Sequence, residues 1–422
     1  MSRQSLKWSR LDNAAKIFPS TSSKQDPKVF RFACELCEPV DPEVLRRALG
    51  RTLEKFPPFR SVLRRGLFWY FLEQSDLVPE VSEESSPPCS PLYNPRRRGL
   101  LFAVTYYRCR INLEVYHALS DGSGALQFLR ALVYDYLLLR HPDAFTHSPS
   151  ALDFDASRSE REDDSFRKHY VPERKGRGEK APRAYHMKGA LLPGGRIRVV
   201  EGSLPVGAAA AKAKELGVSM TVFLTAVLLT AVAGEMPARE RSRRPVVAAV
   251  PVNLRNYFES ESVRNFFGVF TAGYHFQNGW AFDEVLAAVK ASFARELTAD
   301  RLARRMNRLA ALEHNPVIRV MPLAVKDPVL RLSGWIAARG ETTSLSNLGR
   351  ITMPSACAPF IRAFDVFISA RRLQMCMCSY GDRLMLSLTS PFLSTDVPKR
   401  FFRILTGMGL PVEISSNPVS EE

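Results

Sequence analysis

The chain contains two kinds of hydrophobic pattern that follow one another repeatedly. In one, apolar and polar residues alternate, as in strands; in the other, apolar residues recur with the period of a helix. Residues 29–36 alternate in this way, and the next stretch carries apolar residues at helical spacing between Val44 and Leu53. Asp41 and Pro42 stand just before it, as the N-cap and the first position of a helix usually do. This pattern predicts a strand followed by a helix that packs on a sheet.

The same alternation continues up to about residue 145. Residues 59–62 and 67–72 are predicted to form a strand pair that turns at Arg65 and Gly66, and residues 100–107 and 111–117 a hairpin. A long helix is expected after Gly122, because apolar residues recur there at helical spacing: Ala125, Phe128, Leu129, Leu132, Tyr136 and Leu139.

The pattern is interrupted by residues 151–190, which are rich in charges of both signs and lack apolar periodicity. We interpret them as a linker between an N-terminal half, residues 1–150, and a C-terminal half, residues 191–422. Alternation then resumes, with these expected elements: helices over 205–216, 220–234 and 282–304, strands over 246–252, 342–348 and 363–368, a hairpin of 374–380 with 384–389, and a last helix after 396–398. The sequence therefore predicts an α/β protein built of two similar halves.

Composition narrows the class of protein. The chain has 422 residues, of which 45% are hydrophobic, enough for a large core. Its most apolar stretch, residues 222–233, is too short for a membrane span, so a buried helix is expected. Residues 1–10 are basic and precede no apolar segment, so we predict no secretory signal and a cytoplasmic location. The seven cysteines need not pair there, and Cys34 and Cys37 have no further ligand pair nearby, so no metal site is predicted.

A formal net charge of +16 is the strongest bias in the composition. It suits an anionic partner, which leaves open nucleic acid, an acidic membrane surface or a phosphorylated substrate such as coenzyme A. The basic residues are spread along the chain and are not interleaved with aromatic residues, as they are in proteins that stack nucleic-acid bases. We therefore expect no nucleic-acid partner and no transmembrane segment.

The main candidate for chemistry is the sequence His-Ala-Leu-Ser-Asp-Gly at residues 117–122, between a predicted strand and a predicted helix. The imidazole of His117 titrates near neutral pH and can take a proton from a hydroxyl or an amine. Asp121 either orients that ring or turns away and pairs with an arginine. Gly122 leaves room for a close approach, and the following helix amides favour an anion.

This motif and three others, in the same order along the chain, resemble the chloramphenicol acetyltransferase-like superfamily, which includes condensation domains and alcohol acetyltransferases. The other motifs are Phe-Pro-Pro-Phe-Arg at 56–60, Pro-Val-Asn-Leu-Arg at 251–255 and Ser-Leu-Ser-Asn-Leu-Gly at 344–349. The segments 11–19 and 66–70 are most similar to the bacterial alcohol acetyltransferase-like branch. Tyr116 stands where condensation domains usually carry a second histidine, and the Asp-Phe-Gly-Trp-Gly signature of plant members is missing.

The resemblance implies two acyltransferase-like halves, each a mixed sheet covered by helices, in a pseudo-dimer with a tunnel between them. His117 would be the general base and Asp121 the second catalytic-site residue, with a structural role. Gly122 would support the site, with Arg60 as the ion-pair partner of Asp121. The residues implied to line or brace the tunnel are Asn253, Arg255, Ser346 and Asn347.

The implied activity is transfer of an acyl group, acetyl by preference, from a coenzyme A thioester to an alcohol or an amine. The acceptor would attack the thioester directly, so coenzyme A is a co-substrate and no tightly bound cofactor is expected. Two alternatives stay open. One is a non-catalytic binding or assembly module of the same fold, and the other is a condensation enzyme that takes its donor from a carrier protein.

Overall fold

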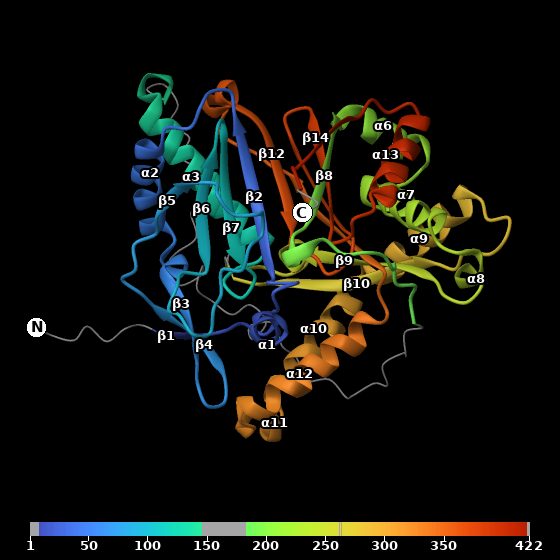
Figure 1. Cartoon of the computed structure of the whole chain (residues 1–422), viewed down its shortest axis with the longest axis horizontal. Helices are drawn as coiled ribbons and strands as arrows, with labels where there is room; N and C mark the ends of the chain where they lie inside the picture. The colour runs from blue at the N-terminus through green and yellow to red at the C-terminus, as the bar shows by residue number, and fades with distance from the viewer. Residues whose placement is uncertain (1–7, 146–182, 261, 263, 420–422) are drawn as a thin grey trace, which may run out of the picture.

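The computed structural model describes residues 8–145, 183–260, 262 and 264–419. Most of the predicted linker and the first seven residues lie outside this range. The described residues form a five-stranded sheet, a seven-stranded sheet and a small three-stranded sheet, with helices packed against them (Figure 1). The two larger sheets each mix parallel and antiparallel pairs. The predicted α/β class with two mixed sheets is therefore confirmed.

The five-stranded sheet belongs mainly to the N-terminal half. Its strand order is β12-β2-β7-β6-β5, with these bounds: β2 (Val29–Leu36), β5 (Val81–Glu83), β6 (Phe102–Tyr107), β7 (Arg110–Tyr116) and β12 (Ile361–Ile368). Two helices in mutual contact, α2 (Pro42–Lys55) and α3 (Gly122–Arg140), lie beside this sheet (Figure 1). The start of α2 follows the sequence, because the Asp41 side chain accepts hydrogen bonds from the N–H groups of Glu43 and Val44.

The seven-stranded sheet belongs to the C-terminal half and has the order β10-β9-β11-β13-β14-β8-β15. Its strands are β8 (Arg198–Pro205), β9 (Val246–Asn253), β10 (Phe267–Tyr274), β11 (Thr343–Arg350), β13 (Gln374–Tyr380), β14 (Arg383–Ser390) and β15 (Glu413–Ser416). The helices associated with this half are α6 (Val206–Glu215), α7 (Met220–Gly234), α8 (Ala238–Arg241), α9 (Phe282–Glu296) and α13 (Asp396–Gly407). Residues 222–233 of α7 are buried from end to end, as the sequence predicts.

The remaining elements lie below the two large sheets in Figure 1. They are the small sheet, β1 (Trp8–Arg10), β3 (Ser61–Arg65) and β4 (Tyr70–Gln74), and the helices α1 (Ile17–Thr21), α10 (Ala299–His314), α11 (Pro316–Val320) and α12 (Leu323–Ala338). The prediction of one helix over residues 282–304 is wrong. The helix ends at Glu296, and Thr298 starts α10 because its side chain accepts a hydrogen bond from Arg301 N–H.

Strand β12 joins the two halves. It lies in the C-terminal half of the sequence, yet it pairs antiparallel with β2 at the edge of the five-stranded sheet. Ser387, on β14 of the other large sheet, donates a hydrogen bond to the buried carboxylate of Asp365 on β12. One strand of the C-terminal half therefore completes the main sheet of the N-terminal half, while the division at residues 151–190 stays a prediction.

The structure also bears on membrane-spanning helices, cysteine pairing and metal sites. Among the described residues no single helix is long and apolar enough to cross a membrane, and α6 with α7 reaches that length only as a pair bent by 84°. The seven cysteines are free thiols. In the same described ranges, no group of three or more histidine, cysteine, aspartate or glutamate side chains is placed to hold a metal ion.

Candidate active site

His117 lies directly after strand β7 and before helix α3, in the turn that the sequence predicts. Its backbone N–H donates to the carbonyl of Lys28 at 2.8 Å. The partly buried imidazole stacks on the ring of Phe18, with centroids 4.6 Å apart, and meets the edge of Phe30 at 4.9 Å. The aromatic rings from α1 and β2 therefore hold the plane of the imidazole.

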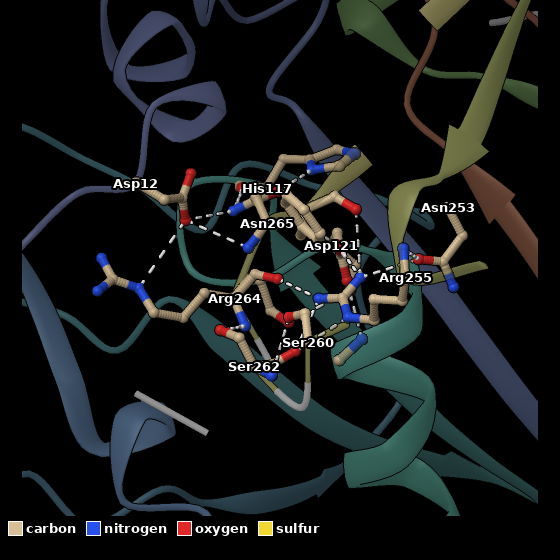
Figure 2. A network of polar contacts seen from close by, with 12 residues as sticks. Asp12, His117, Asp121, Asn253, Arg255, Ser260, Ser262, Arg264 and Asn265 are labelled. Atoms are coloured by element: carbon tan, nitrogen blue, oxygen red, sulfur yellow. Dashed lines mark hydrogen bonds and ion pairs between the residues drawn. The ribbon is translucent and has the colours of Figure 1, made fainter. Parts of the chain in front are cut away.

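Asn265 determines which nitrogen of His117 carries the proton (Figure 2). The Asn265 Nδ2 group faces two oxygens that can only accept, the carbonyl of His117 at 3.1 Å and the Asp12 carboxylate at 3.2 Å. Its Oδ1 therefore faces His117 Nδ1, at 3.3 Å, and accepts a hydrogen bond from it. The Nδ1 atom then holds the proton, so Nε2 has a free lone pair.

The electrostatic surroundings keep this ring neutral. Burial lowers the pKa of His117 below its ordinary value of 6.5, and the negative charge of Asp121 and the hydrogen bond to Asn265 oppose that shift in part. At pH 7 the imidazole is therefore a neutral base. No hydrogen-bond partner for Nε2 is found among the residues that the structure describes.

Asp121 does not bond to the imidazole. Its Oδ1 accepts from the N–H of Gly124 at 2.9 Å and so caps helix α3. Its Oδ2 accepts from Arg255 Nη1 and from the N–H of Phe266, both at 2.8 Å. Of the two roles left open by the sequence, Asp121 has the structural one. The Gly124 N–H is one of the helix amides that we expected to favour an anion, and it is already bonded to Asp121.

The expected ion pair between Asp121 and Arg60 is wrong. The arginine that pairs with Asp121 is Arg255, and both side chains are buried, 10% and 5% exposed for Arg255 and Asp121. Arg60 ends the 3-10 helix Pro57–Arg60, where its carbonyl accepts from Ser75 N–H. Arg60 and Arg255 each end an apolar motif, so the local sequence does not show which of them pairs with Asp121. The packing of the two halves decides it.

Arg255 fastens the segment that carries Asn265. Besides Asp121, its guanidinium donates to the carbonyls of Ser262, at 2.8 and 3.1 Å, and of Arg264 (Figure 2). The side chain of Asn253 accepts from both the backbone and the guanidinium of Arg255, at 3.1 and 3.2 Å. Asn253 and Arg255 therefore brace the loop next to His117.

Asp12 and Asn265 belong to this network, and sequence reasoning assigned them no role. The buried Asp12 carboxylate accepts from Ala15 N–H at 2.7 Å and from Asn265 N–H at 3.2 Å. Arg264 lies on its other side, with Nε 3.9 Å from Asp12 Oδ2 (Figure 2). The one available signal was the position of Asp12 in the segment 11–19, which contributes to the family resemblance. The isolated Asn265 offered none.

The motif at residues 344–349 contacts the site through one residue. A Cβ atom on Gly122 would lie 2.9 Å from Leu348 Cδ2, so the glycine allows β11 to approach the start of α3. Asn347 is exposed and donates to Thr221 Oγ1 at 2.9 Å, and Ser346 is partly buried beside Cys376 of β13. Neither has a described contact with His117, so their role as tunnel residues stays a prediction.

A cavity of about 600 Å³ lies elsewhere, between α6, α7 and α9. Lys214, Val218 and Phe293 are among its lining residues, and none of the residues around His117 lines it. The tunnel between the halves therefore stays a prediction.

Comparison with known proteins assigns the fold. No protein-family model and no curated protein matches the sequence. Among solved structures, TRI101 of F. sporotrichioides in complex with coenzyme A and T-2 superposes with a TM-score of 0.65 at 12% identity, covering 97% of this chain and 99% of that one. The chain has the fold of coenzyme A-dependent acyltransferases and condensation domains.

Two more structures of this superfamily span the chain in the same way. The trichothecene 15-O-acetyltransferase TRI3 of Fusarium sporotrichioides has a TM-score of 0.62 at 11% identity and covers 97% of this chain and 96% of its own. The first condensation domain of the CDA synthetase has a TM-score of 0.58 at 15% identity and covers 96% of both chains. The fold expected from the four motifs is therefore confirmed over nearly the whole length.

Proposed function

We propose that the chain is an acyltransferase that moves an acyl group from a coenzyme A thioester to an alcohol or an amine, with His117 as the general base. The observation that carries the proposal is the contact of Asn265 Oδ1 with His117 Nδ1, which assigns the proton to Nδ1. Because burial also lowers the pKa of His117, the imidazole is inferred to be neutral at pH 7, with a free lone pair on Nε2. That is the state a general base needs.

In the proposed reaction the acceptor hydroxyl or amine gives its proton to His117 Nε2 as its oxygen or nitrogen attacks the thioester carbonyl carbon. The tetrahedral intermediate then collapses, the carbon–sulfur bond breaks, and the sulfur of coenzyme A takes the proton back from Nε2. No acyl-enzyme forms. Asp121, Arg255 and Asn265 hold the base in position and take no part in bond making.

Acetyl as the acyl group and a bacterial alcohol acetyltransferase-like specificity are our narrower proposals. The net charge of +16 favours a donor with several phosphates, as coenzyme A has. TRI101 was solved with coenzyme A, and TRI3 is an O-acetyltransferase by name. A cytoplasmic location, where acyl-coenzyme A is made, belongs to the same proposal.

The experiment compares His117→Ala with His141→Ala in thiol release from acetyl- and octanoyl-coenzyme A, with a panel of alcohols and amines. His141 is a matched control, because its partly exposed imidazole also stacks on a phenylalanine, Phe360, with centroids 4.2 Å apart. We expect His117→Ala to lose at least about 100-fold in kcat and His141→Ala to keep its rate. An unchanged rate in His117→Ala refutes the general base.

A donor held by a carrier protein is the second candidate, favoured by the fold shared with the CDA condensation domain. Rates with the same acyl group on free coenzyme A and on a carrier protein separate the two donors. If no acceptor and no donor gives turnover while coenzyme A still binds, the chain is a binding module of this fold.

A further inference from the structure

Helix α12 has its polar side turned inward and its apolar side turned outward. The buried residues near its start include Lys326 and Asp327. The outward side carries five large apolar side chains, each between 52% and 57% exposed: Val325, Val329, Leu332, Trp335 and Ile336. Val325, Val329, Leu332 and Ile336 recur at helical spacing, so they form one continuous stripe along the helix.

Polar contacts fix this orientation. Asp327 accepts hydrogen bonds from Ser20 Oγ at 2.6 Å and from the Tyr70 hydroxyl at 3.1 Å. Lys326 donates to the carbonyl of Phe68 at 2.8 Å, and its ammonium lies 3.3 Å from the centre of the Trp69 ring. Because both polar side chains are held by α1 and by the β3–β4 turn, α12 cannot rotate to bury its stripe.

The turn between β3 and β4 extends the same apolar surface. Leu323, at the start of α12, donates its N–H to the carbonyl of Leu67 at 2.9 Å. The side chain of Leu67 is 69% exposed, and that of Phe68 is exposed as well. The turn and the α10–α12 helices project on the same side of the molecule (Figure 1). We call the five α12 side chains with Leu67 and Phe68 the α12 face.

Basic residues accompany this face. Residues 299–340 contain eight arginines and lysines against three acidic residues. Lys326 and Asp327 are both buried. Arg301 and Arg305 pair with Glu296, which leaves five basic and two acidic residues. Arg319 is exposed next to α12, and Arg339 places its guanidinium 3.8 Å from the centre of the Trp335 ring. An apolar stripe with a tryptophan and a basic surround is typical of protein surfaces that lie on anionic lipid.

We propose that the α12 face docks on an anionic lipid bilayer, with its apolar side chains in the acyl boundary and its arginines at the lipid phosphates. Exposed apolar side chains that gather on one face commonly mark an interaction site, and the positive charge beside this face selects an anionic surface over a neutral one. α12 packs on α1, whose Phe18 stacks on His117. Docking therefore places the candidate active site one helix away from the lipid.

The test measures co-sedimentation of the full chain with phosphatidylcholine vesicles, with and without 30% phosphatidylglycerol. We expect binding to the anionic vesicles, weaker binding at high salt, and little binding to phosphatidylcholine alone. Leu332→Glu should lower the affinity at least tenfold, and Arg319→Glu should lower it less and reduce its dependence on salt. Ile414→Glu is the matched control, because Ile414 on β15 is also 57% exposed and lies away from α12.

Melting temperatures of the variants are measured in parallel, and we expect them to equal that of the parent because the substituted side chains face outward. The proposal is overturned if the chain does not bind the anionic vesicles. Light scattering then tests whether a second copy of the chain covers the face, as a dimer that Leu332→Glu dissociates. Equal loss of vesicle binding in Leu332→Glu and Ile414→Glu also overturns it. None of these outcomes depends on acyl transfer.

Discussion

Replacing Arg255 by methionine removes the guanidinium that joins Asp121 to the loop bearing Asn265. Among the residues that the structure describes, the Asp121 carboxylate, 5% exposed, then keeps as donors the backbone N–H groups of Gly124 and Phe266. Breaking a buried ion pair from one side costs about 3–5 kcal/mol, because a charge is left without its partner. We therefore expect the free energy of unfolding of Arg255→Met to fall by about 4 kcal/mol, and its melting temperature by roughly 5 °C, since the entropy of unfolding scales with the 422 residues of the chain.

A double-mutant cycle shows whether the ion pair is the cause. Asp121→Asn removes the charge that Arg255→Met would strand, so the double variant should lose about 2 kcal/mol less than the sum of the two single losses. The control is Arg362→Met, which breaks the exposed pair of Arg362 with Glu35 and should cost less than about 1 kcal/mol. Calorimetry at pH 7.5 measures all four variants. A loss below 1 kcal/mol in Arg255→Met, or strictly additive losses, would refute the reasoning.

Three further predictions follow from the site and from the contact between the sheets. The acid limb of the pH–rate profile should have its midpoint below pH 6.5, because burial lowers the pKa of His117. Asn265→Ala should move this midpoint lower still, because the Asn265 hydrogen bond raises the pKa of His117. The same substitution should also reduce the plateau rate. A midpoint that moves upward contradicts the tautomer assignment. Gly122→Ala should cost about 1 kcal/mol, because the new Cβ meets the Leu348 side chain at 2.9 Å, and trimming Leu348 to alanine should restore most of that loss in thermal melts. Burial of Glu201 on β8 and the nearby carboxylate of Asp365 on β12 raise the pKa of Glu201 to about 9. The folded state therefore binds more protons than the unfolded one, and stability falls as pH rises from about 4.5 to 9. Glu201→Gln should therefore raise the melting temperature at pH 8 and leave it unchanged at pH 4; an equal gain at both values would exclude the linkage.

Local signals predicted most of the secondary structure. Asp41 and Pro42 mark the start of α2, and Gly381 with Asp382 marks the β13–β14 turn, because caps and turns depend on adjacent residues. The break between α9 and α10 was missed. Apolar periodicity continues across Leu297. The Thr298 cap that starts α10 is a single hydrogen bond, a weaker signal than the helical pattern of the 15 residues of α9 and the 16 residues of α10.

In the candidate site, too, the residues of one local motif were predicted, whereas contacts between distant segments were not. His117, Asp121 and Gly122 were found because they lie within six residues of each other in one motif. Arg255 was found as a brace, yet its partnership with Asp121 joins residues 134 positions apart and needs the packing of both halves. Asn265 and Asp12 are 253 positions apart. Asn265 contacts both His117 and Asp12, but no local sequence pattern marks a single asparagine with such contacts.

The position of β12 has a consequence for synthesis. Strand β2 is followed by more than three hundred residues before β12, its neighbour at the sheet edge, leaves the ribosome at Ile368. During that time the nascent chain presents an open strand edge, which is a template for aggregation. A fragment that ends before residue 361 retains this open edge for good, so co-expressed fragments should yield soluble protein only when the second one supplies the missing strand.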